Sequence, residues 1–188
     1  PADRFAGRAG PLRLLVVGGS LGAQGLSERV PGALARLPAV ARPQVVHQAG
    51  AKHIDALARA YRDAGVEAEC VAFIDDMASR YAWADFAIAR GGALTVSELA
   101  AVGLGSLIVP LPGAIADEQT ANAEFLVRAG GAIRIAQDAL GTERLASILS
   151  SLDRPKALAM ASAARAVGRT DASDRVADAC LEAAGRKS

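Results

Sequence analysis

The sequence predicts an α/β domain in which an open parallel sheet is covered by helices on both faces. Short apolar segments alternate with helical stretches of about 10 to 15 residues along most of the chain, which is typical of this fold class. Hydrophobic residues make up 52% of the 188 residues but aromatic residues only 4%. The core must therefore consist of Leu, Val, Ile and Ala packed between helices and strands. The length suits one domain with a substantial core.

The first strand is predicted after a short N-terminal segment. Residues 1–11 contain two glycines and no apolar periodicity, which indicates a linker or tail. The domain, residues 12–188, is expected to begin with the nearly continuous apolar run Leu12–Val17, a strand buried on both faces. A helix that continues to about Leu37 should follow.

The same alternation continues along the chain. The other expected strands are Gln44–His47, Glu69–Ala72, Asp85–Ala89, Leu107–Val109 and Ala132–Ile135, and the expected helices are Ile54–Ala64, Met77–Trp83, Leu94–Val102 and Gln119–Ala129. From Thr142 onward the chain is expected to be helical, with breaks at Pro155 and Gly168. Ligands of open parallel sheets bind outside the carboxyl ends of the strands, so the loops that follow the strands are the expected site.

A glycine-rich turn follows the first strand. Gly18, Gly19 and Gly22 would allow a phosphate to approach backbone N–H groups at a helix N-terminus, and Ser20 could add a hydroxyl donor. The alternative is a tight turn in which Ser20 is the helix N-cap. The segment is not the dinucleotide-binding fingerprint, because the glycine pattern fails at Ser20 and no acidic residue ends the second strand. The Lys-Ser/Thr pair of a Walker motif is also missing.

A second glycine-marked turn, Arg90–Glu98, joins another strand to a helix. After Gly91 and Gly92, a diphosphate could rest on the helix N-terminus, where the dipole and unpaired amides favour negative charge. Glu98, one turn further, could accept hydrogen bonds from both ribose hydroxyls. The spacing Thr95-x-x-Glu98 is equally that of a capping box, in which the glutamate satisfies a backbone donor of its own helix. Both interpretations stay open at this point.

A third candidate segment lies at a junction between a loop and a helix. It contains Glu118, Gln119 and Asn122. Carboxylates and amides supply the donors and acceptors that sugar hydroxyls require. The alternative is an ordinary first helical turn that is enriched in acidic residues.

Composition excludes several partners. The net charge is +1, the pI is about 8.4 and no block of like charges is present, so nucleic acid is not an expected ligand. No apolar run approaches the roughly 18 residues that span a bilayer, and no signal peptide is evident. The chain is therefore expected to be cytoplasmic.

Metal binding and histidine catalysis are not indicated either. Cys70 and Cys180 lie far apart, without the spacing of a zinc site or a disulfide framework. The neighbours Asp75 and Asp76 point apart, so a helix cap is a better interpretation than a metal site. His47 at a strand end has no carboxylate partner at helical spacing and is expected to be structural, as is His53.

Six segments together resemble one bacterial family. They are Gly-Gly-Ser-Leu-Gly-Ala at 18–23, His-Gln-Ala-Gly at 47–50, Phe-Ile-Asp-Asp-Met at 73–77, Tyr-Ala-Trp-Ala-Asp at 81–85, Arg-Gly-Gly-Ala-Leu-Thr-Val-Ser-Glu at 90–98 and Gln-x-x-Asn-Ala at 119–123. In this order they closely resemble the MurG family of UDP-N-acetylglucosamine (UDP-GlcNAc) transferases, which convert lipid I to lipid II in peptidoglycan synthesis. The resemblance runs from about Leu12 to Ile135. It implies the Rossmann-like, donor-binding C-terminal half of a two-domain GT-B fold, with the N-terminal acceptor domain absent.

The resemblance also implies roles for individual residues. The substrate-binding residues would be Ser20, Ile74, Ala93, Leu94, Thr95, Glu98, Glu118 and Gln119, with Gly18, Gly19, Gly22, Gly91 and Gly92 as phosphate-loop glycines and Arg90 and Asn122 in support. The backbone of Ile74 would contact the uracil, and Glu98 the ribose. Ser20 and the amides of residues 93–95 would bind the diphosphate, and Glu118 and Gln119 would face the sugar. Glu118 departs from the family, whose members usually carry His or Gln there, and a carboxylate accepts but cannot donate. An arginine that the family carries before the first strand of this domain is not seen in residues 1–11.

The implied reaction is inverting transfer of N-acetylglucosamine to the 4-hydroxyl of the muramyl sugar of lipid I. Helix dipoles and amides would stabilise the departing UDP, so neither a metal nor a cofactor is expected. No catalytic residue is assigned in this chain, because the general base, the acceptor site and the membrane contact would belong to the missing domain. The isolated domain would bind UDP-GlcNAc weakly and be inactive, and the full-length protein would be peripheral on the cytoplasmic face of the inner membrane. The alternatives are another UDP-sugar enzyme of this fold (a glycosyltransferase or 2-epimerase), an NAD(P)-binding domain, or a non-catalytic binding module.

Overall fold

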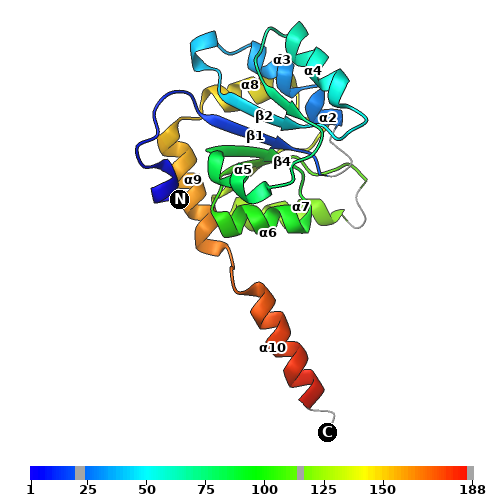
Figure 1. The fold of residues 1–188 in the computed structure, drawn as a ribbon, viewed down its shortest axis with the longest axis vertical. Helices are drawn as coiled ribbons and strands as arrows, with labels where there is room; N and C mark the ends of the chain where they lie inside the picture. The colour runs from blue at the N-terminus through cyan, green and yellow to red at the C-terminus, as the bar shows by residue number, and fades with distance from the viewer. Residues whose placement is uncertain (20–23, 114–116, 186–188) are drawn as a thin grey trace.

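The computed structural model describes residues 1–19, 24–113 and 117–185. In this part of the chain, six strands form one sheet in the order β3-β2-β1-β4-β5-β6 (Figure 1). Each strand is parallel to its neighbours. The predicted open parallel sheet is therefore confirmed.

The strand order places a topological switch point at the centre of the sheet. The strands are β1 (Arg13–Val17), β2 (Gln44–Gln48), β3 (Glu69–Val71), β4 (Phe86–Ala89), β5 (Ser106–Ile108) and β6 (Ala132–Arg134). From β1 the chain winds outward to β3, then returns to β4 on the other side of β1 and winds outward again to β6. Ligand sites of such folds lie where the winding direction reverses, which here is between β1 and β4.

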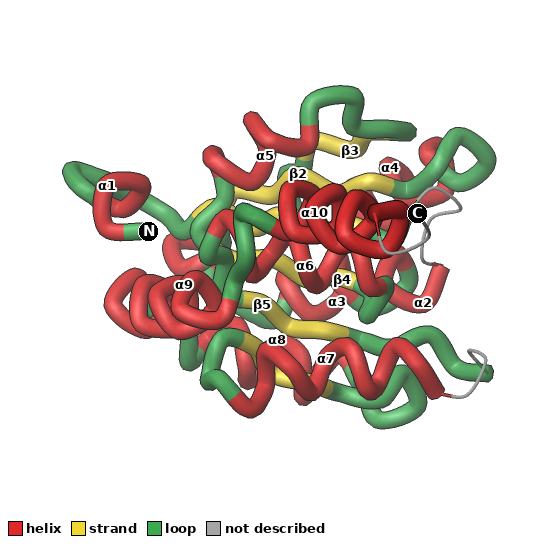
Figure 2. The backbone as a smooth tube through the Cα atoms, turned by 90° about the horizontal axis from the view of Figure 1, so that it is seen from below, coloured by secondary structure: helices red, strands yellow, loops and turns green. Residues whose placement is uncertain are grey.

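Helices cover both faces of the sheet. They are α1 (Ala2–Phe5), α2 (Gln24–Ser27), α3 (Val30–Ala35), α4 (Ile54–Asp63), α5 (Met77–Trp83), α6 (Ala93–Val102), α7 (Glu118–Arg128), α8 (Thr142–Ser150), α9 (Arg154–Val167) and α10 (Ala172–Gly185), with a 3-10 turn at Ala39–Ala41. Figure 1 shows α3, α4 and α8 on one side of the strands and α5, α6 and α7 on the other. Figure 2 shows the strands among these helices in a perpendicular view.

Alternate residues of β1 supply two separate cores. Leu14 and Val16 pack with the helices α3, α4 and α8. Leu15 and Val17 pack with α5, α6 and α7 on the opposite face. All four side chains are buried, because successive residues of a strand point to opposite faces and both faces are covered. This explains why the strand is apolar from Leu14 to Val17.

The expected helix through Leu37 is interrupted. The structure divides it into α2, which ends at Ser27, and α3, which has Pro31 in its first turn. Proline lacks an N–H group and its ring clashes with the preceding turn, so it is accepted at the start of a helix but not in its interior. The predicted breaks near the C-terminal end are confirmed, because Pro155 lies in the first turn of α9 and Gly168 is its C-cap.

The N-terminal segment is attached to the domain more firmly than the expected linker or tail. Helix α1 lies beside α9 (Figure 1), and Phe5 is buried against Ala157 and Ala161. Arg4 donates hydrogen bonds to the carbonyls of Val102 and Gly103 at the C-terminal end of α6. These partners lie almost 100 residues away in the sequence, so composition alone does not indicate the attachment.

A buried carboxylate provides a second attachment. Asp85 is fully buried and binds Arg8 at 2.5 Å and Arg154 at 3.3 Å. The Oδ2 atom, which binds Arg154, also accepts the backbone N–H of Arg13 at 3.0 Å. One carboxylate therefore joins the N-terminal segment, β1 and α9 at the amino edge of the sheet.

Helix α10 extends away from the sheet in Figure 1, and its Val176 and Leu181 are exposed. In the described ranges, no helix combines the length and the apolar character that crossing a membrane requires.

Candidate functional site

The two glycine-marked turns meet at the carboxyl edge of the sheet. Val17 at the end of β1 pairs with Ala89 at the end of β4. The turns that follow them, beginning at Gly18 and Arg90, therefore leave the sheet side by side at the switch point. Ser20 and Gly22 lie outside the described residues, so their predicted roles stay predictions.

The N-terminus of α6 is open toward this edge. Gly92 is the N-cap and, in the part of the chain described, no side chain caps the helix. The first intrahelical bond runs from the N–H of Val96 to the carbonyl of Gly92 at 3.0 Å. The N–H groups of Ala93, Leu94 and Thr95 thus point out of the helix end, where the helix dipole favours an anion.

A tyrosine to which the sequence assigned no role holds Glu98. The Oε2 atom of Glu98 accepts a hydrogen bond from the Tyr81 hydroxyl at 2.9 Å. The capping-box alternative is wrong: a capping box needs Thr95 at the N-cap, and Thr95 is the third residue of the helix. Glu98 therefore lies in the second turn of α6, half-buried beside α5.

The Tyr81 hydroxyl is a permanent donor to this carboxylate. Burial raises the pKa of Tyr81 well above its ordinary value, and the hydrogen bond to Glu98 and the negative charge of Glu98 raise it further. The phenol keeps its proton throughout the physiological pH range. No signal in the sequence indicates the pair, because Tyr81 and Glu98 lie on different helices.

Gln119 and Asn122 connect α7 to the second glycine turn. The Oε1 atom of Gln119 accepts the N–H groups of Gly91 at 3.2 Å and Leu111 at 2.9 Å. The amide of Asn122 donates to the carbonyl of Gly91 at 3.0 Å. The carbonyl of the Gln119 side chain is therefore occupied by the protein, and its NH₂ group is the part available to a ligand.

Gly91 permits this close approach. A Cβ atom at residue 91 would lie 2.3 Å from the backbone oxygen of Gln119, whereas at Gly92 the nearest atom is the Thr95 hydroxyl at 3.9 Å. The two neighbouring glycines thus differ in function. Gly91 is required by packing, whereas a Cβ atom at residue 92 would make no close contact with the described part of the chain.

Arg90 binds the loops around the candidate site through hydrogen bonds. It is almost buried and donates to the carbonyls of Val109 at 3.0 Å and Pro110 at 3.3 Å. It also donates to the Oε1 atom of Gln137 at 2.6 Å, a residue that sequence reasoning missed. Burial lowers the pKa of Arg90, with a smaller contribution from the charge of Arg29. Arg90 therefore holds the loops that follow β5 and β6, and its supporting role at a ligand stays a prediction.

The segment between β3 and α5 borders the same region. Ile74 is buried against the core that contains Tyr81, whereas the neighbouring Phe73 is 61% exposed. Asp76 begins α5 and accepts the N–H of Ser79 at 3.0 Å. This confirms the predicted helix cap.

Glu118 is the first residue of α7 and is exposed. The preceding Asp117 has a positive φ of 54°, which directs the chain from the loop into the helix. Glu118 and Gln119 thus enter α7 next to the Gly91 turn, and their contacts with a sugar stay predictions.

His47 is structural, as expected. It is buried, and its Nδ1 atom shares a hydrogen bond of 2.9 Å with the Tyr61 hydroxyl. Burial lowers the pKa of His47 to about 3, so the ring is neutral in the folded protein. Among the described residues, no three His, Cys, Asp or Glu side chains form a group that could hold a metal.

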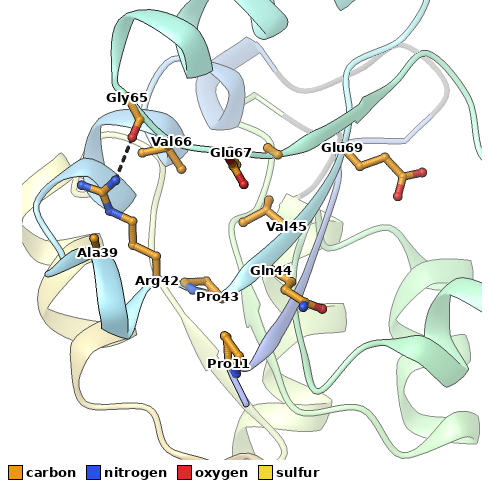
Figure 3. A pocket seen from close by; sticks show the side chains of 11 residues that line it. Pro11, Ala39, Arg42, Pro43, Gln44, Val45, Gly65, Val66, Glu67 and Glu69 are labelled. Atoms are coloured by element: carbon orange, nitrogen blue, oxygen red, sulfur yellow. Dashed lines mark hydrogen bonds between the residues drawn. The ribbon is translucent and has the colours of Figure 1, made fainter. Parts of the chain in front are cut away.

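A hollow on the opposite edge of the sheet is not the site. It has a volume of about 640 Å³ and is lined by residues at the amino ends of β2 and β3, including Gln44 and Glu69 (Figure 3). Arg42 borders it and donates to the carbonyl of Gly65 at 2.7 Å. Parallel sheets bind ligands at the carboxyl ends of the strands, where the helix N-termini point.

Similar proteins identify the fold and the family. The model of the glycosyltransferase family 28 C-terminal domain matches residues 13–176. A UDP-N-acetylglucosamine–N-acetylmuramyl-(pentapeptide) pyrophosphoryl-undecaprenol N-acetylglucosamine transferase of Azoarcus sp. is 61% identical over all 188 residues, which cover 53% of that relative. Its counterpart in Aromatoleum aromaticum is 58% identical with the same coverage. The chain thus spans about half the length of these curated relatives.

Solved structures support the same fold and family. The crystal structure of Acinetobacter baumannii MurG matches with a TM-score of 0.91 and 38% identity, over 96% of this chain and 52% of that one. The calicheamicin glycosyltransferase CalG4 matches with a TM-score of 0.61 and 20% identity, which supports the fold alone. The resemblance to the MurG family and the assignment to the C-terminal half of a GT-B fold are confirmed. This chain therefore belongs to the family of glycosyltransferase family 28 C-terminal domains.

Proposed function

We propose that this chain binds UDP-GlcNAc at the N-terminus of α6 and is the donor half of the transferase that converts lipid I to lipid II. The observation that carries the proposal is the arrangement at the switch point. Three outward-pointing N–H groups of α6 lie one helical turn before Glu98, a carboxylate held by Tyr81. The names and identities of the relatives support the choice of this donor and acceptor.

Each part of the donor has a candidate partner. The N–H groups of residues 93–95 bind the diphosphate, with Ser20 as an additional donor. Glu98 accepts hydrogen bonds from the two ribose hydroxyls. The backbone at Ile74, in the segment that leads into the helix carrying Tyr81, contacts the uracil, as the resemblance to the MurG family implies.

The sugar is bound beside the first turn of α7. Gln119 donates from its NH₂ group, because its carbonyl already accepts two backbone N–H groups. Glu118, as a carboxylate, accepts from a sugar hydroxyl. Asn122 and Arg90 hold the backbone around these residues.

The reaction is an inverting displacement that needs no metal in this half. The 4-hydroxyl of the muramyl sugar attacks the anomeric carbon, the bond from that carbon to the phosphate oxygen breaks, and UDP leaves with the electron pair. The amides and dipole of α6 stabilise the charge that develops on the diphosphate. The attacking hydroxyl loses its proton to a base outside this chain. The acceptor site and the contact with the cytoplasmic face of the membrane are likewise assigned to the other half of the protein.

Binding of UDP to Glu98→Ala tests the proposal. Calorimetry should detect UDP binding to the wild-type chain. The variant should lose about 1 to 3 kcal/mol of binding free energy, because the polar contact with the ribose is removed. Ser97→Ala, an exposed neighbour on the same helix, is the matched control and should bind UDP normally. A wild-type chain whose melting temperature is unchanged by millimolar UDP would contradict the proposal, since a ligand of the folded state must raise it.

Two comparisons separate the alternatives. Equal affinities for UDP-GlcNAc and UDP-glucose would remove the case for recognition of the N-acetyl group and favour another UDP-sugar enzyme. Binding of NAD(P) that survives Glu98→Ala would favour a dinucleotide-binding domain.

A further inference from the structure

Tyr81 occupies an unusual position between two parts of the proposed donor site. Tyr81 is buried, with 3% of its surface exposed. It packs in the same core as Ile74 and Val96. Its hydroxyl leaves this core and donates to the Oε2 atom of Glu98 at 2.9 Å. Figure 1 shows its helix, α5, next to α6 on one face of the sheet.

We propose that Tyr81 is a positioning residue that aims the Glu98 carboxylate at the ribose and thereby makes the site selective for ribonucleotides over deoxyribonucleotides. This inference rests on the proposed function, in which Glu98 binds the ribose hydroxyls. It concerns how that contact is organised before the ligand arrives.

The geometry of the carboxylate explains the effect. A glutamate side chain rotates about three bonds, and fixing it on binding costs conformational entropy. Within the described residues, the bond to Tyr81 is the one hydrogen bond that holds the Glu98 side chain. It uses one acceptor position of Oε2 and leaves Oε1 and the remaining position of Oε2 to receive two hydroxyls. The conformational entropy of the Glu98 side chain is then lost when the protein folds instead of when the ligand binds.

The Tyr81 hydroxyl also stays protonated and fixed in position. The pKa of Tyr81 is raised by burial and by the neighbouring carboxylate, so the group donates at every working pH. The ring is held by the core, so the hydroxyl has little freedom to move. Because α5 begins directly after the Ile74 segment, one rigid residue ties the uracil-binding segment to the ribose-binding carboxylate.

A double-mutant cycle tests the inference. Dissociation constants for UDP and 2′-deoxy-UDP are measured by calorimetry for the wild-type chain, Tyr81→Phe, Glu98→Ala and the double variant. Tyr81→Phe keeps the ring and removes the hydroxyl. We expect it to weaken UDP binding about tenfold, to weaken binding of 2′-deoxy-UDP, which keeps only the 3′-hydroxyl, by a clearly smaller factor, and to have no further effect in the Glu98→Ala background.

Tyr61→Phe is the matched control. It also removes a buried phenol hydroxyl that is hydrogen bonded, but from the His47 pair on another part of the sheet. It should change the affinity for neither nucleotide. Melting temperatures of all variants separate loss of folding from loss of positioning.

The outcomes distinguish the inference from the proposed function. If the wild-type chain binds UDP and loses affinity with Glu98→Ala, but Tyr81→Phe binds UDP as tightly as wild type, the positioning role is wrong and the proposed function survives. An equal loss for both nucleotides that persists with Glu98→Ala would show a purely structural role. Failure of the wild-type chain to bind UDP would overturn both.

Discussion

The two adjacent glycines of the second turn allow a direct test of the packing in the site. A Cβ atom at residue 91 would lie 2.3 Å from the Gln119 carbonyl oxygen and 3.0 Å from the carbonyl carbon. These are backbone atoms, so no side-chain rotation can relieve the contact. Gly91→Ala must therefore push the start of α7 away from the turn.

The expected cost follows from what this movement breaks. Overpacking of this kind costs about 1 to 3 kcal/mol. The N–H of Gly91 also loses the Gln119 side chain at 3.2 Å, and its carbonyl loses Asn122 at 3.0 Å. At about 1 kcal/mol for each hydrogen bond, the free energy of unfolding should fall by about 3 to 5 kcal/mol in total.

Gly92→Ala is the matched comparison. Residue 92 has φ −61° and ψ 140°, which alanine adopts freely, and among the described residues a Cβ atom would meet no atom closer than 3.9 Å. Alanine is a poorer N-cap than glycine, so we expect a change within about 1 kcal/mol. Urea unfolding followed by circular dichroism measures both variants. Equal unfolding midpoints for Gly91→Ala and Gly92→Ala would refute the reasoning.

Two further predictions concern buried ionisable groups. The pKa of His47 is about 3 in the folded protein, below its unfolded value of 6.5. Between these values the unfolded state binds more protons than the folded state, so the stabilisation from neutral His47 is complete above about pH 6.5 and is lost as the pH falls. At about pH 5 the free energy of unfolding should be lower by about 2 kcal/mol. Denaturant unfolding at a series of pH values checks this, and a His47→Leu variant that keeps the same acid dependence would contradict it. Asp85→Ala leaves Arg8, Arg154 and the Arg13 N–H without their shared carboxylate, and we expect a loss of about 3 to 5 kcal/mol. Arg154→Ala, which keeps the pair between Asp85 and Arg8, should cost less in the same unfolding experiment, and the reverse order would argue against Asp85 as the centre of the cluster.

The sheet was predictable because its signals are local. A strand buried on both faces must be largely apolar, as Leu14–Val17 is, and a chain that turns from a strand into a helix needs residues such as Gly91 and Gly92. The helix cap at Asp76 is equally local, since its partner Ser79 is three residues away. The interruption before α3 had a local signal too, in Pro31, which rules out a continuous helix through that point.

The roles of particular side chains depend on which elements pack together, and periodicity does not encode this. The spacing of Thr95 and Glu98 fitted both a capping box and a ligand contact, and only the position of Gly92 as the N-cap and of Tyr81 on a neighbouring helix excluded the first. Likewise, Gln119 could be recognised as a polar residue at a helix start, but its bonds to two other loops required the folded chain. Residues close in sequence therefore determined the architecture of this protein, whereas contacts between distant segments, formed only when both cores are packed, determined how its site is built.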